Sequence, residues 1–564
     1  MIMNKNELIA SLIHIEGISQ EEILSLLVPP KDLGFADLAL PCFRFAKALR
    51  KSPVEIANGL AAEISANLPS FLLSCTALNG YLNFKFVRDD VAKSTLLKVF
   101  SEGDDYGKCD LGAGKTICID YSSVNIAKPF HIGHLSSTVI GGALARIFRA
   151  LGYEVVGINH LGDWGTQFGK MIVAYKKWGD PEEIKKGGVK ALHKLYVKFH
   201  QEAEKDDSLN DLGRAYFKRI EDGDPEALSL FETFKSISLA EAKRVYDRLG
   251  ITFESYNGES FYNDKMQPVL DLLTAKGLLM DSEGAKVVEV GEDMPPCLLV
   301  RSDGATLYAT RDLAAAYYRK KTYDFYKCLY VVAYQQNLHF RQVFKVIELL
   351  GEPWAKDLEH VAFGMVSLTS GTMSSRQGKV EYLEDVLNSA VNKAREIIEV
   401  KSPDLENKDL VAEQVGVGAV IFGALQNNRI KDITFSYEKV LNFDGETCPY
   451  VQYTHARANS ILEKAGAFDP EKADFSSLES AHELISAIAS FGDTVVAAGD
   501  KREPSMVTRL SVDIAELFNK FYIDNRILNA EDGVKEARLL LTAAVRQVLK
   551  NALSLLGIAA PDKM

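Results

Sequence analysis

The sequence lacks the marks of several protein classes. No run of hydrophobic residues approaches the ~18 residues of a membrane-spanning helix. The first twenty residues mix Glu7 and Glu16 with apolar positions and contain no signal-peptide core. The seven cysteines are scattered, odd in number and without a CxxC pair, which argues against a zinc finger or a disulfide framework. These absences predict a cytoplasmic protein that has no membrane segment and no structural zinc.

Positive charge is also in deficit. Lys and Arg number 65 against 77 Asp and Glu, and the net charge of −12 is the opposite of what a non-specific nucleic-acid coat carries. Nucleic-acid binding by local basic faces stays open. The composition that remains, 47% hydrophobic and 25% charged, is that of an ordinary globular protein. With 564 residues the chain exceeds the ~250–300 at which one core stops growing, so we expect several domains.

The first part of the chain, 1–110, has the pattern of a small α+β domain. Pro53 opens a helical pattern over 53–66, and Gly80–Phe86 alternates apolar and polar residues as a strand does. A Gly- and Asp-rich stretch at 101–115 is typical of a linker. Just before the helix at 53–66, a second helical stretch is predicted to carry a basic face of Arg44, Lys47, Arg50 and Lys51. This face is either solvated surface or a contact for a polyanion.

The pattern changes twice more along the chain. Residues 111–405 alternate amphipathic helices with apolar strands, which predicts an α/β fold with a Rossmann-like parallel sheet. The predicted strands are Thr116–Ser122, Val155–Asn159, Val287–Val290 and Cys328–Ala333. Charged, helical residues at about 175–250 form a predicted insertion. After a polar break, 406–564 is predicted to be all-helical, with apolar stripes at Leu510, Ile514, Leu517 and Phe521 and at Leu541, Val545, Val548, Ala552 and Leu555.

The segment SSVNIAKPFHIGH, Ser122–His134, joins the first of these strands to a helical pattern. A strand, a polar loop and a helix start are the geometry of a nucleotide site, because helix N-terminal N–H groups favour phosphates. His131 and His134 face the same side of a helical turn, and Gly133 lets a flat ring approach the backbone. The two histidines suit a role as hydrogen-bond donors to a bound triphosphate. For HxxH alone, the plainer alternative is a capping or metal-binding pair.

His131-Ile132-Gly133-His134 is similar to the HIGH signature of class I aminoacyl-tRNA synthetases. Its flanks, together with NHLGDWGTQFGK at Asn159–Lys170, resemble the arginyl-tRNA synthetases, and the likeness covers nearly the whole chain. The resemblance implies a catalytic domain at 111–405, between a domain at 1–110 that binds the corner of tRNA and an anticodon-binding domain at 406–564. It also implies ATP, with Mg²⁺ on the phosphates.

A second family motif is degenerate here. Phe363–Lys379 stands where class I enzymes keep the mobile KMSKS loop, but Ser375 replaces its second lysine. In arginyl enzymes without that lysine, a lysine just upstream of HIGH takes over the phosphate contact, and Lys128 stands there. The resemblance thus implies catalytic roles for His131, His134 and Lys128. It implies ATP contacts from His131, Gly133, His134, Met365, Met373, Ser374 and Ser375.

A pocket for arginine must neutralise a guanidinium with carboxylates and hold a free amino group and a carboxylate. By resemblance, Asp312 and Glu259 face the cationic head and Tyr308 lines the cleft. The remaining candidates, which would hold the amino-acid backbone groups, are Ser123, Asn125 and Gln336, with Asp120 as a further candidate for the ammonium. Taken alone, an Asp after Thr-Arg is more often a helix cap than a ligand, so the joint pattern carries this prediction.

The resemblance also extends to tRNA. Tyr453, Tyr522 and Met564 match positions that contact the anticodon loop, where flat or soft side chains stack unpaired bases; the alternative is that both tyrosines pack between helices. In the first domain, Arg44, Lys47, Arg50 and Lys51 become phosphate contacts.

The implied activity is that of an arginine–tRNA ligase. The arginine carboxylate attacks the α-phosphate of ATP, giving arginyl-adenylate and pyrophosphate, and a ribose hydroxyl of the terminal adenosine of tRNA-Arg then attacks the adenylate. The resemblance implies a monomer whose first step can require bound tRNA. The alternatives are a class I synthetase for another amino acid such as cysteine or glutamate, a catalytically silent relative that binds RNA or a protein, and an adenylate-forming enzyme that acts on another small molecule.

Overall fold

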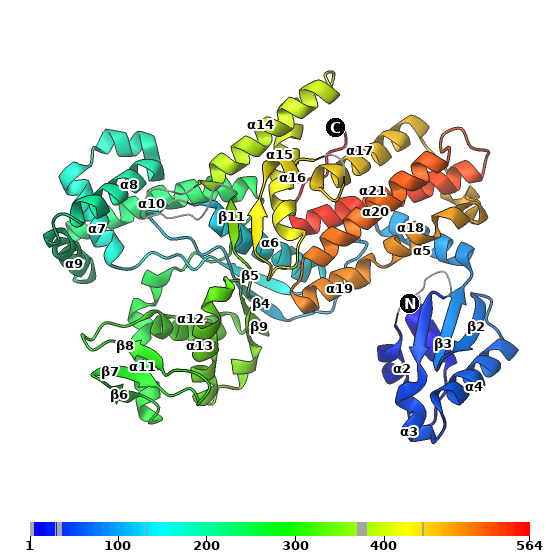
Figure 1. Ribbon diagram of the computed structural model, residues 1–564, viewed down its shortest axis with the longest axis horizontal. Helices are drawn as coiled ribbons and strands as arrows, with labels where there is room; N and C mark the ends of the chain where they lie inside the picture. The colour runs from blue at the N-terminus through cyan, green and yellow to red at the C-terminus, as the bar shows by residue number, and fades with distance from the viewer. Residues whose placement is uncertain (1–4, 29, 31–35, 129, 369–380, 443–444) are drawn as a thin grey trace. The chain divides into compact units, whose positions relative to one another are not determined.

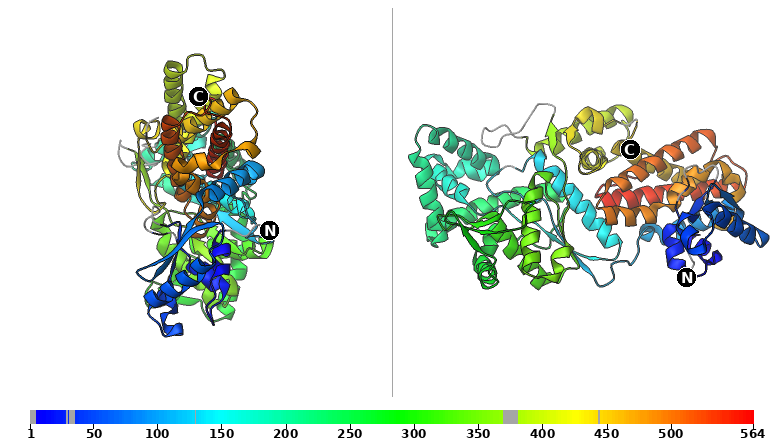
Figure 2. Two further views of the ribbon diagram at one scale, coloured as in Figure 1. Left: turned by 90° about the vertical axis from the view of Figure 1, so that its right-hand side faces the viewer. Right: turned by 60° about the horizontal axis from the view of Figure 1, so that its bottom comes forward.

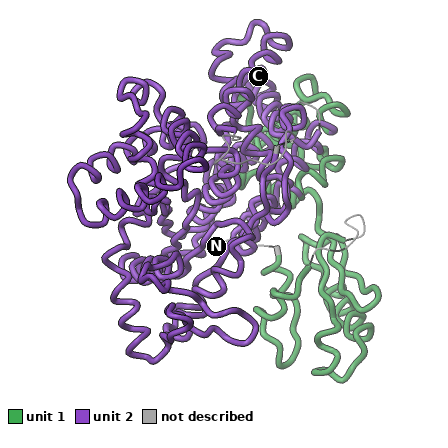
Figure 3. Tube along the Cα trace, turned by 60° about the vertical axis from the view of Figure 1, so that its left-hand side comes forward, with its two compact units in different colours: residues 1–101, 465–486, 521–544 green, residues 102–464, 487–520, 545–564 purple. Residues whose placement is uncertain are grey.

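A computed structural model describes residues 5–28, 30, 36–128, 130–368, 381–442 and 445–564. The chain divides into two compact units, which Figure 3 shows in separate colours. Unit 1 comprises Met1–Ser101, Ala465–Ser486 and Phe521–Ala544. Unit 2 comprises Glu102–Lys464, Ala487–Lys520 and Val545–Met564.

Unit 1 contains an antiparallel three-stranded sheet in the order β1-β3-β2. Its strands are β1 (Leu38–Pro41), β2 (Leu72–Leu78) and β3 (Tyr81–Phe86). The N-terminal helices around it are α1 (Lys5–Leu12), α2 (Gln20–Leu26), α3 (Ala46–Leu49), α4 (Pro53–Ala66) and α5 (Arg88–Glu102). The predicted α+β character of this part is confirmed.

The helix α4 has the bounds predicted from Pro53. Its start is fixed by a capping box in which Ser52 Oγ accepts the Glu55 N–H at 3.2 Å and the Glu55 carboxylate accepts the Ser52 N–H at 2.8 Å. Its buried face packs on β2 and β3. The basic stretch before it is helical only in part, because α3 ends at Leu49 and the next residue, Arg50, has a left-handed φ of 51°.

Unit 2 is built around a four-stranded parallel sheet in the order β10-β9-β4-β5, as predicted for an α/β fold. Its strands are β4 (Thr116–Asp120), β5 (Glu154–Ile158), β9 (Lys327–Tyr330) and β10 (Leu358–His360). Helix α6 (Leu135–Ala150) joins β4 to β5 and packs on both strands. After β4 the chain continues to β5, towards one edge of the sheet, and after β9 it continues to β10, towards the other edge. The carboxyl ends of β4 and β9 therefore form the topological switch point where such folds bind ligands.

The predicted parallel strand at Val287–Val290 is wrong. Here β6 (Met280–Ser282), β7 (Ala285–Val288) and β8 (Cys297–Val300) form a separate antiparallel sheet. Glu283 and Gly284, both with positive φ, form the two-residue turn between β6 and β7, which is typical of a tight hairpin. A two-residue turn joins antiparallel strands, whereas a parallel pair needs a crossover connection of a dozen or more residues.

The predicted insertion is a group of four helices, which lie together in Figure 1 and again in Figure 2. These are α7 (Thr166–Trp178), α8 (Pro181–Ala203), α9 (Ser208–Glu221) and α10 (Pro225–Arg248). Helices α7 and α9 pack closely, with Gly169 and Gly213 at their crossing: a Cβ at Gly169 would lie 1.9 Å from the carbonyl oxygen of Gly213.

The later part of the chain is helical, as predicted, apart from one short strand. Its helices are α14 (Leu383–Lys401), α15 (Lys408–Leu425), α16 (Tyr437–Val440), α17 (Cys448–Ala465), α18 (His482–Ala489), α19 (Phe491–Lys501), α20 (Ser505–Asp524) and α21 (Val534–Leu556). The strand β12 (Ile433–Phe435) pairs in parallel with β11 (Val366–Leu368). Its residues, Ile-Thr-Phe, are of the β-branched and aromatic types that favour a strand.

Helix α21 is the one helix among the described residues that is a candidate for a membrane span. By length and composition it could cross a membrane, with a mean hydropathy of 1.3 over an 18-residue window. Most of that window, 61%, is buried inside the protein, which is the behaviour of a core helix. The stripe predicted from Leu541 onwards supplies much of this burial, and the helix ends before Gly557, whose φ is 78°.

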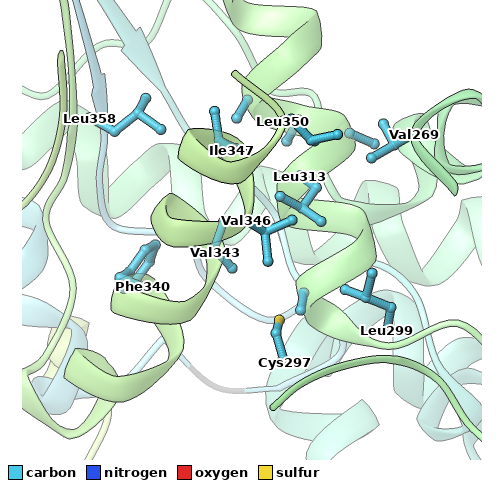
Figure 4. Packing of buried hydrophobic residues seen from close by; sticks show 14 of the residues in the cluster. Val269, Cys297, Leu299, Leu313, Phe340, Val343, Val346, Ile347, Leu350 and Leu358 are labelled. Carbon is cyan, nitrogen blue, oxygen red and sulfur yellow. The ribbon is translucent and has the colours of Figure 1, made fainter. Parts of the chain in front are cut away.

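A hydrophobic core in unit 2 fixes two helices that carry polar site residues (Figure 4). Leu313 of α12 (Tyr308–Tyr323) and Val343 and Val346 of α13 (Asn337–Leu349) are buried in it. Each such side chain contributes about 1.5–3 kcal/mol when fully buried. Helix α11 (Met266–Ala275) packs against α12 and extends the core.

All seven cysteines lie in the described part of the chain, and of these Cys109 alone is exposed.

Candidate active site

The His131–His134 motif forms a tight turn between β4 and α6. Ile132–His134 is one turn of 3-10 helix, and the Gly133 N–H donates to His131 Nδ1 at 3.0 Å. The His131 N–H lies 3.3 Å from His134 Nδ1, and the centroids of the two rings are 4.0 Å apart. The structure therefore brings the two imidazoles together as predicted. Because Nδ1 of His131 accepts a hydrogen bond, the proton of its neutral ring is on Nε2.

Both imidazoles are neutral at physiological pH. Burial lowers the pKa of His131 to about 4, with further lowering from His193 and Lys128. Burial, the neighbouring His131 and Lys128 lower the pKa of His134 to about 3. The pair can thus donate N–H hydrogen bonds but carries no charge, whereas the half-buried Lys128 supplies a positive charge beside it.

Asp312 lies inside α12, in its second turn, and is therefore not a helix cap. Its Oδ2 is 2.6 Å from His339 Nε2, and its Oδ1 is 4.0 Å from His160 Nε2. Burial alone would raise the pKa of Asp312, but the hydrogen bond and charge of His339, together with His160 and Arg319, lower it below its usual value. Asp312 is therefore an ionised carboxylate set between two imidazoles.

Glu259 is the second candidate carboxylate for a guanidinium. It begins a 3-10 segment, Glu259–Lys265, and its N–H donates to the Leu161 carbonyl at 2.9 Å. Burial raises the pKa of Glu259 to about 7, against the opposing charge of Arg311 and together with Asp312 and Asp163. The two candidate carboxylates thus have pKa values moved in opposite directions.

Asp120 is already paired on both oxygens. Arg319 donates to its Oδ2 at 2.7 Å, and Ser123 Oγ donates to its Oδ1 at 2.8 Å. Ser123, three residues after the end of β4, is held with a φ of 47°, in the left-handed region. Arg319 also approaches His160 Nδ1 at 3.4 Å, so Asp120, Arg319, His160 and Asp312 form one connected polar cluster.

Sequence reasoning missed Arg319, His160 and His339. His160 stands in the segment Asn159–Lys170 that resembles the family, and Arg319 follows Asp312 by seven residues, which places both on one face of α12. That spacing was the available signal for Arg319. His339 gave a weaker signal, because it lies on α13 and meets Asp312 through the packing of two helices.

The other predicted pocket residues are more open. Tyr308 is 67% exposed at the start of α12, and Asn125 and Gln336 are also exposed. Asn125 forms a bridge with Gly162, so the loop after β4 runs beside the segment after β5. Met365 is half-buried, and its N–H donates to Asp432 at 2.7 Å. Met373, Ser374 and Ser375 lie outside the described residues.

The predicted tRNA-contact residues are surface groups. Arg44, Lys47, Arg50 and Lys51 are all exposed in unit 1. Tyr453 is 41% exposed, with the Arg457 guanidinium 4.7 Å from its ring centroid. Tyr522 is 40% exposed and Met564 is half-buried. Across the described part of the chain, no group of three or more His, Cys, Asp or Glu residues could hold a metal ion.

Comparison with known proteins covers almost the full length. Residues 95–437 match the family described as tRNA synthetases class I (R), catalytic domain. Residues 451–564 match the DALR anticodon binding domain, and residues 4–86 match the arginyl tRNA synthetase N terminal domain.

Individual relatives agree with these matches. An arginine–tRNA ligase of Alkaliphilus metalliredigens is 52% identical over 558 residues, which cover 98% of this chain and 97% of that protein. One from Clostridioides difficile is 52% identical over 555 residues, with the same coverage. Among solved structures, Thermus thermophilus arginyl-tRNA synthetase has a TM-score of 0.83 at 27% identity and covers 95% of this chain and 96% of its own. That of Plasmodium falciparum has a TM-score of 0.78 at 25% identity, covering 95% and 94%.

Proposed function

Because the chain belongs to the class I arginyl-tRNA synthetases and so joins arginine to tRNA with ATP, we propose specific roles for its site residues. In the first step, arginine and ATP give arginyl-adenylate and pyrophosphate. In the second, a ribose hydroxyl of the terminal adenosine of tRNA-Arg takes the arginyl group and releases AMP. The proposed site lies at the carboxyl ends of β4 and β9.

His131, His134 and Lys128 stabilise the displacement at the α-phosphate. The two neutral imidazoles donate hydrogen bonds to phosphate oxygens as charge develops on them, and the Lys128 ammonium neutralises that charge. The ring separation of 4.0 Å supports their action on one group. The remaining ATP contacts come from Gly133, Met365, Met373, Ser374 and Ser375. Mg²⁺ enters on the ATP phosphates and adds further positive charge there.

Asp312 and Glu259 bind the guanidinium group of arginine. Asp312 supplies a permanent negative charge, and Glu259 supplies a second carboxylate that ionises when the cation enters. Tyr308 lines the entrance. Ser123, Asn125 and Gln336 hold the amino and carboxylate groups of the amino acid, and Asp120 contributes at this end by orienting Ser123 through their 2.8 Å hydrogen bond.

Contact with tRNA-Arg is divided among three regions. Residues 1–110 bind the corner of the tRNA, with Arg44, Lys47 and Arg50 on its phosphates. Residues 111–405 hold the catalytic site, and 406–564 bind the anticodon loop through Tyr453, Tyr522 and Met564. We place the enzyme in the cytoplasm as a monomer.

The observation that carries this proposal is the ionised Asp312, placed by α12 beside Arg319 and His339. It is tested by pyrophosphate exchange with each of the twenty amino acids, with and without total tRNA. Exchange with arginine alone among the amino acids, lost in the Asp312→Asn variant, is the expected result. Exchange that survives this substitution with an unchanged KM for arginine would remove Asp312 from the pocket. The tRNA arm of the assay decides whether bound tRNA is needed for the first step.

A further inference from the structure

Helix α10 of the insertion reaches the segment that follows β5. Lys235 Nζ lies 2.7 Å from Asp163 Oδ2. The side chain of Asp163 is fully buried, and that of Lys235 is 22% exposed. A carboxylate buried this completely needs a charge partner or full hydrogen bonding, and Lys235 is the cation that contacts it.

Asp163 in turn holds the residue after Glu259. The Ser260 N–H donates to Asp163 Oδ1 at 2.8 Å, and Ser260 Oγ donates to Oδ2 at 2.7 Å. Oδ2 therefore receives both the Ser260 hydroxyl and the Lys235 ammonium. One buried carboxylate thus joins the insertion to the segment that carries a proposed arginine-binding side chain.

The backbone around Glu259 is closely confined. Its N–H donates to the Leu161 carbonyl at 2.9 Å. At the preceding position, a Cβ on Gly258 would lie 2.6 Å from Asp163 Oδ1 and 2.7 Å from the Leu161 carbonyl oxygen. Movement of the Asp163 carboxylate would therefore be transmitted directly to the backbone from which Glu259 projects.

We propose that Lys235 is a positioning residue for arginine recognition, which acts through Asp163 to fix the Glu259 carboxylate. The proposal rests on the assignment of Glu259 to the guanidinium in the proposed function. Lys235 does not touch the substrate itself. Its removal leaves the Asp163 charge without its cation, and the surrounding backbone, including 258–260, shifts to admit water or a new partner.

A neighbouring residue on the same helix gives an internal comparison. Ser238, three residues after Lys235, is buried, and its Oγ accepts the Ala127 N–H at 2.9 Å. Ala127 has a φ of 59° and directly precedes Lys128. One face of α10 thus contacts two segments of the proposed site. Lys235 contacts Asp163, beside the segment that carries Glu259, and Ser238 contacts the backbone beside Lys128. Substitutions at these two positions should therefore change different KM values, that for arginine and that for ATP.

The primary test is the Lys235→Met variant in arginine-dependent pyrophosphate exchange. We expect the KM for arginine to rise about 10- to 100-fold, as for a misplaced binding group, while the KM for ATP stays within about twofold. Lys235→Arg, which keeps a cation for Asp163, restores most of the arginine KM. Lys243→Met on the exposed side of the same helix is the matched control and leaves both constants unchanged. Ser238→Ala shifts the KM for ATP instead.

A double-mutant cycle separates this proposal from the function beneath it. If Lys235 acts through Glu259, Lys235→Met raises the arginine KM much less in a Glu259→Gln background than in the wild type. An unchanged arginine KM in Glu259→Gln alone would overturn the assignment of Glu259. Two results would overturn the positioning role alone, provided that Glu259→Gln itself raises the arginine KM. In the first, Lys235→Met has equal effects in both backgrounds. In the second, Lys235→Met changes the KM values for arginine and ATP equally. Thermal melting of each variant identifies any loss that comes from unfolding.

Discussion

Asp120 and Arg319 form an ion pair closed off from solvent, with 2.7 Å between Oδ2 and the guanidinium nitrogen and side-chain exposures of 8% and 1%. Asp120 ends the central strand β4, and Arg319 lies on α12 two turns beyond Asp312. The pair therefore ties the sheet to the helix that carries a proposed substrate-binding carboxylate.

Removing one member of this pair is expected to destabilise the protein strongly. Arg319→Met leaves the Asp120 carboxylate buried without a counter-charge, which typically costs about 3–5 kcal/mol of unfolding free energy. The Asp120→Asn, Arg319→Met double variant leaves no uncompensated charge and should lose less. Urea unfolding followed by circular dichroism measures both. Equal losses in the single and double variants would contradict this account.

The HIGH imidazoles are expected to act as neutral donors across the usual assay range. Their pKa values of about 4 and 3 lie below it, so protonation of His131 or His134 produces no acid limb in the exchange rate above about pH 6. His134→Ala, which removes a donor, should slow exchange by about 10²–10³-fold. His134→Asn keeps an N–H donor and should retain more activity. An Asn variant as slow as the Ala variant would contradict the donor role.

Arginine binding is expected to weaken as the pH falls through 7. Free Glu259, with its pKa raised to about 7, is protonated below that pH, and a guanidinium must displace the proton. The KM for arginine should therefore rise towards low pH, with release of a proton on binding that titration calorimetry in two buffers detects. Glu259→Gln should have a higher KM that varies less with pH in this range.

Asp312 should be needed for arginine and not for ATP. Asp312→Asn removes a half-buried negative charge, which in the proposed site faces the cationic substrate, and losses of this kind are about 2–5 kcal/mol in binding free energy. Steady-state exchange with arginine varied, and separately with ATP varied, checks the split. Asp324→Asn at the exposed end of the same helix is the control, because its left-handed backbone suits Asn and its carboxylate, which pairs with Lys320, is 90% exposed.

Tyr453 should affect the KM for tRNA and not the KM for arginine. Stacking of an unpaired base on an aromatic ring is worth about 1–3 kcal/mol, so Tyr453→Ala should raise the KM for tRNA about 5- to 150-fold. Tyr453→Phe keeps the ring and should behave like the wild type. A KM for tRNA unchanged in the Ala variant would instead favour a packing role beside Arg457.

What the sequence predicts well is local. The HIGH turn, the capped helix at 53–66 and the parallel strands at β4, β5 and β9 all follow from residues close together in the chain. The hairpin at β6–β7 is equally local and Glu283-Gly284 signals it, but the apolar run that follows also has the composition of a strand in a parallel sheet.

The contacts that set the charges of the site are not local. Asp120 and Arg319 are 199 residues apart, and Lys235 lies 72 residues from Asp163. In the sequence, Arg319, Asp163 and Lys235 look like ordinary charged surface groups, and Asp120 resembles a ligand for the substrate ammonium and not the partner of an arginine. Only the packing of α12 on the sheet and of α10 on the segment after β5 makes them partners, so their effect on Asp312 and Glu259 is visible in the structure alone.

Of the seven cysteines, Cys109 alone presents an exposed thiol for chemical labelling of the native protein. Burial raises the pKa of Cys42 to about 11 and of Cys75 and Cys297 to about 12, so these groups hold almost no thiolate at neutral pH, whereas Cys109 is exposed to solvent. An alkylating fluorophore should therefore label the folded chain at Cys109, without any engineered substitution. The slower appearance of label at buried positions would then time the opening of each unit, since Cys42 and Cys75 belong to unit 1 and Cys297 to unit 2.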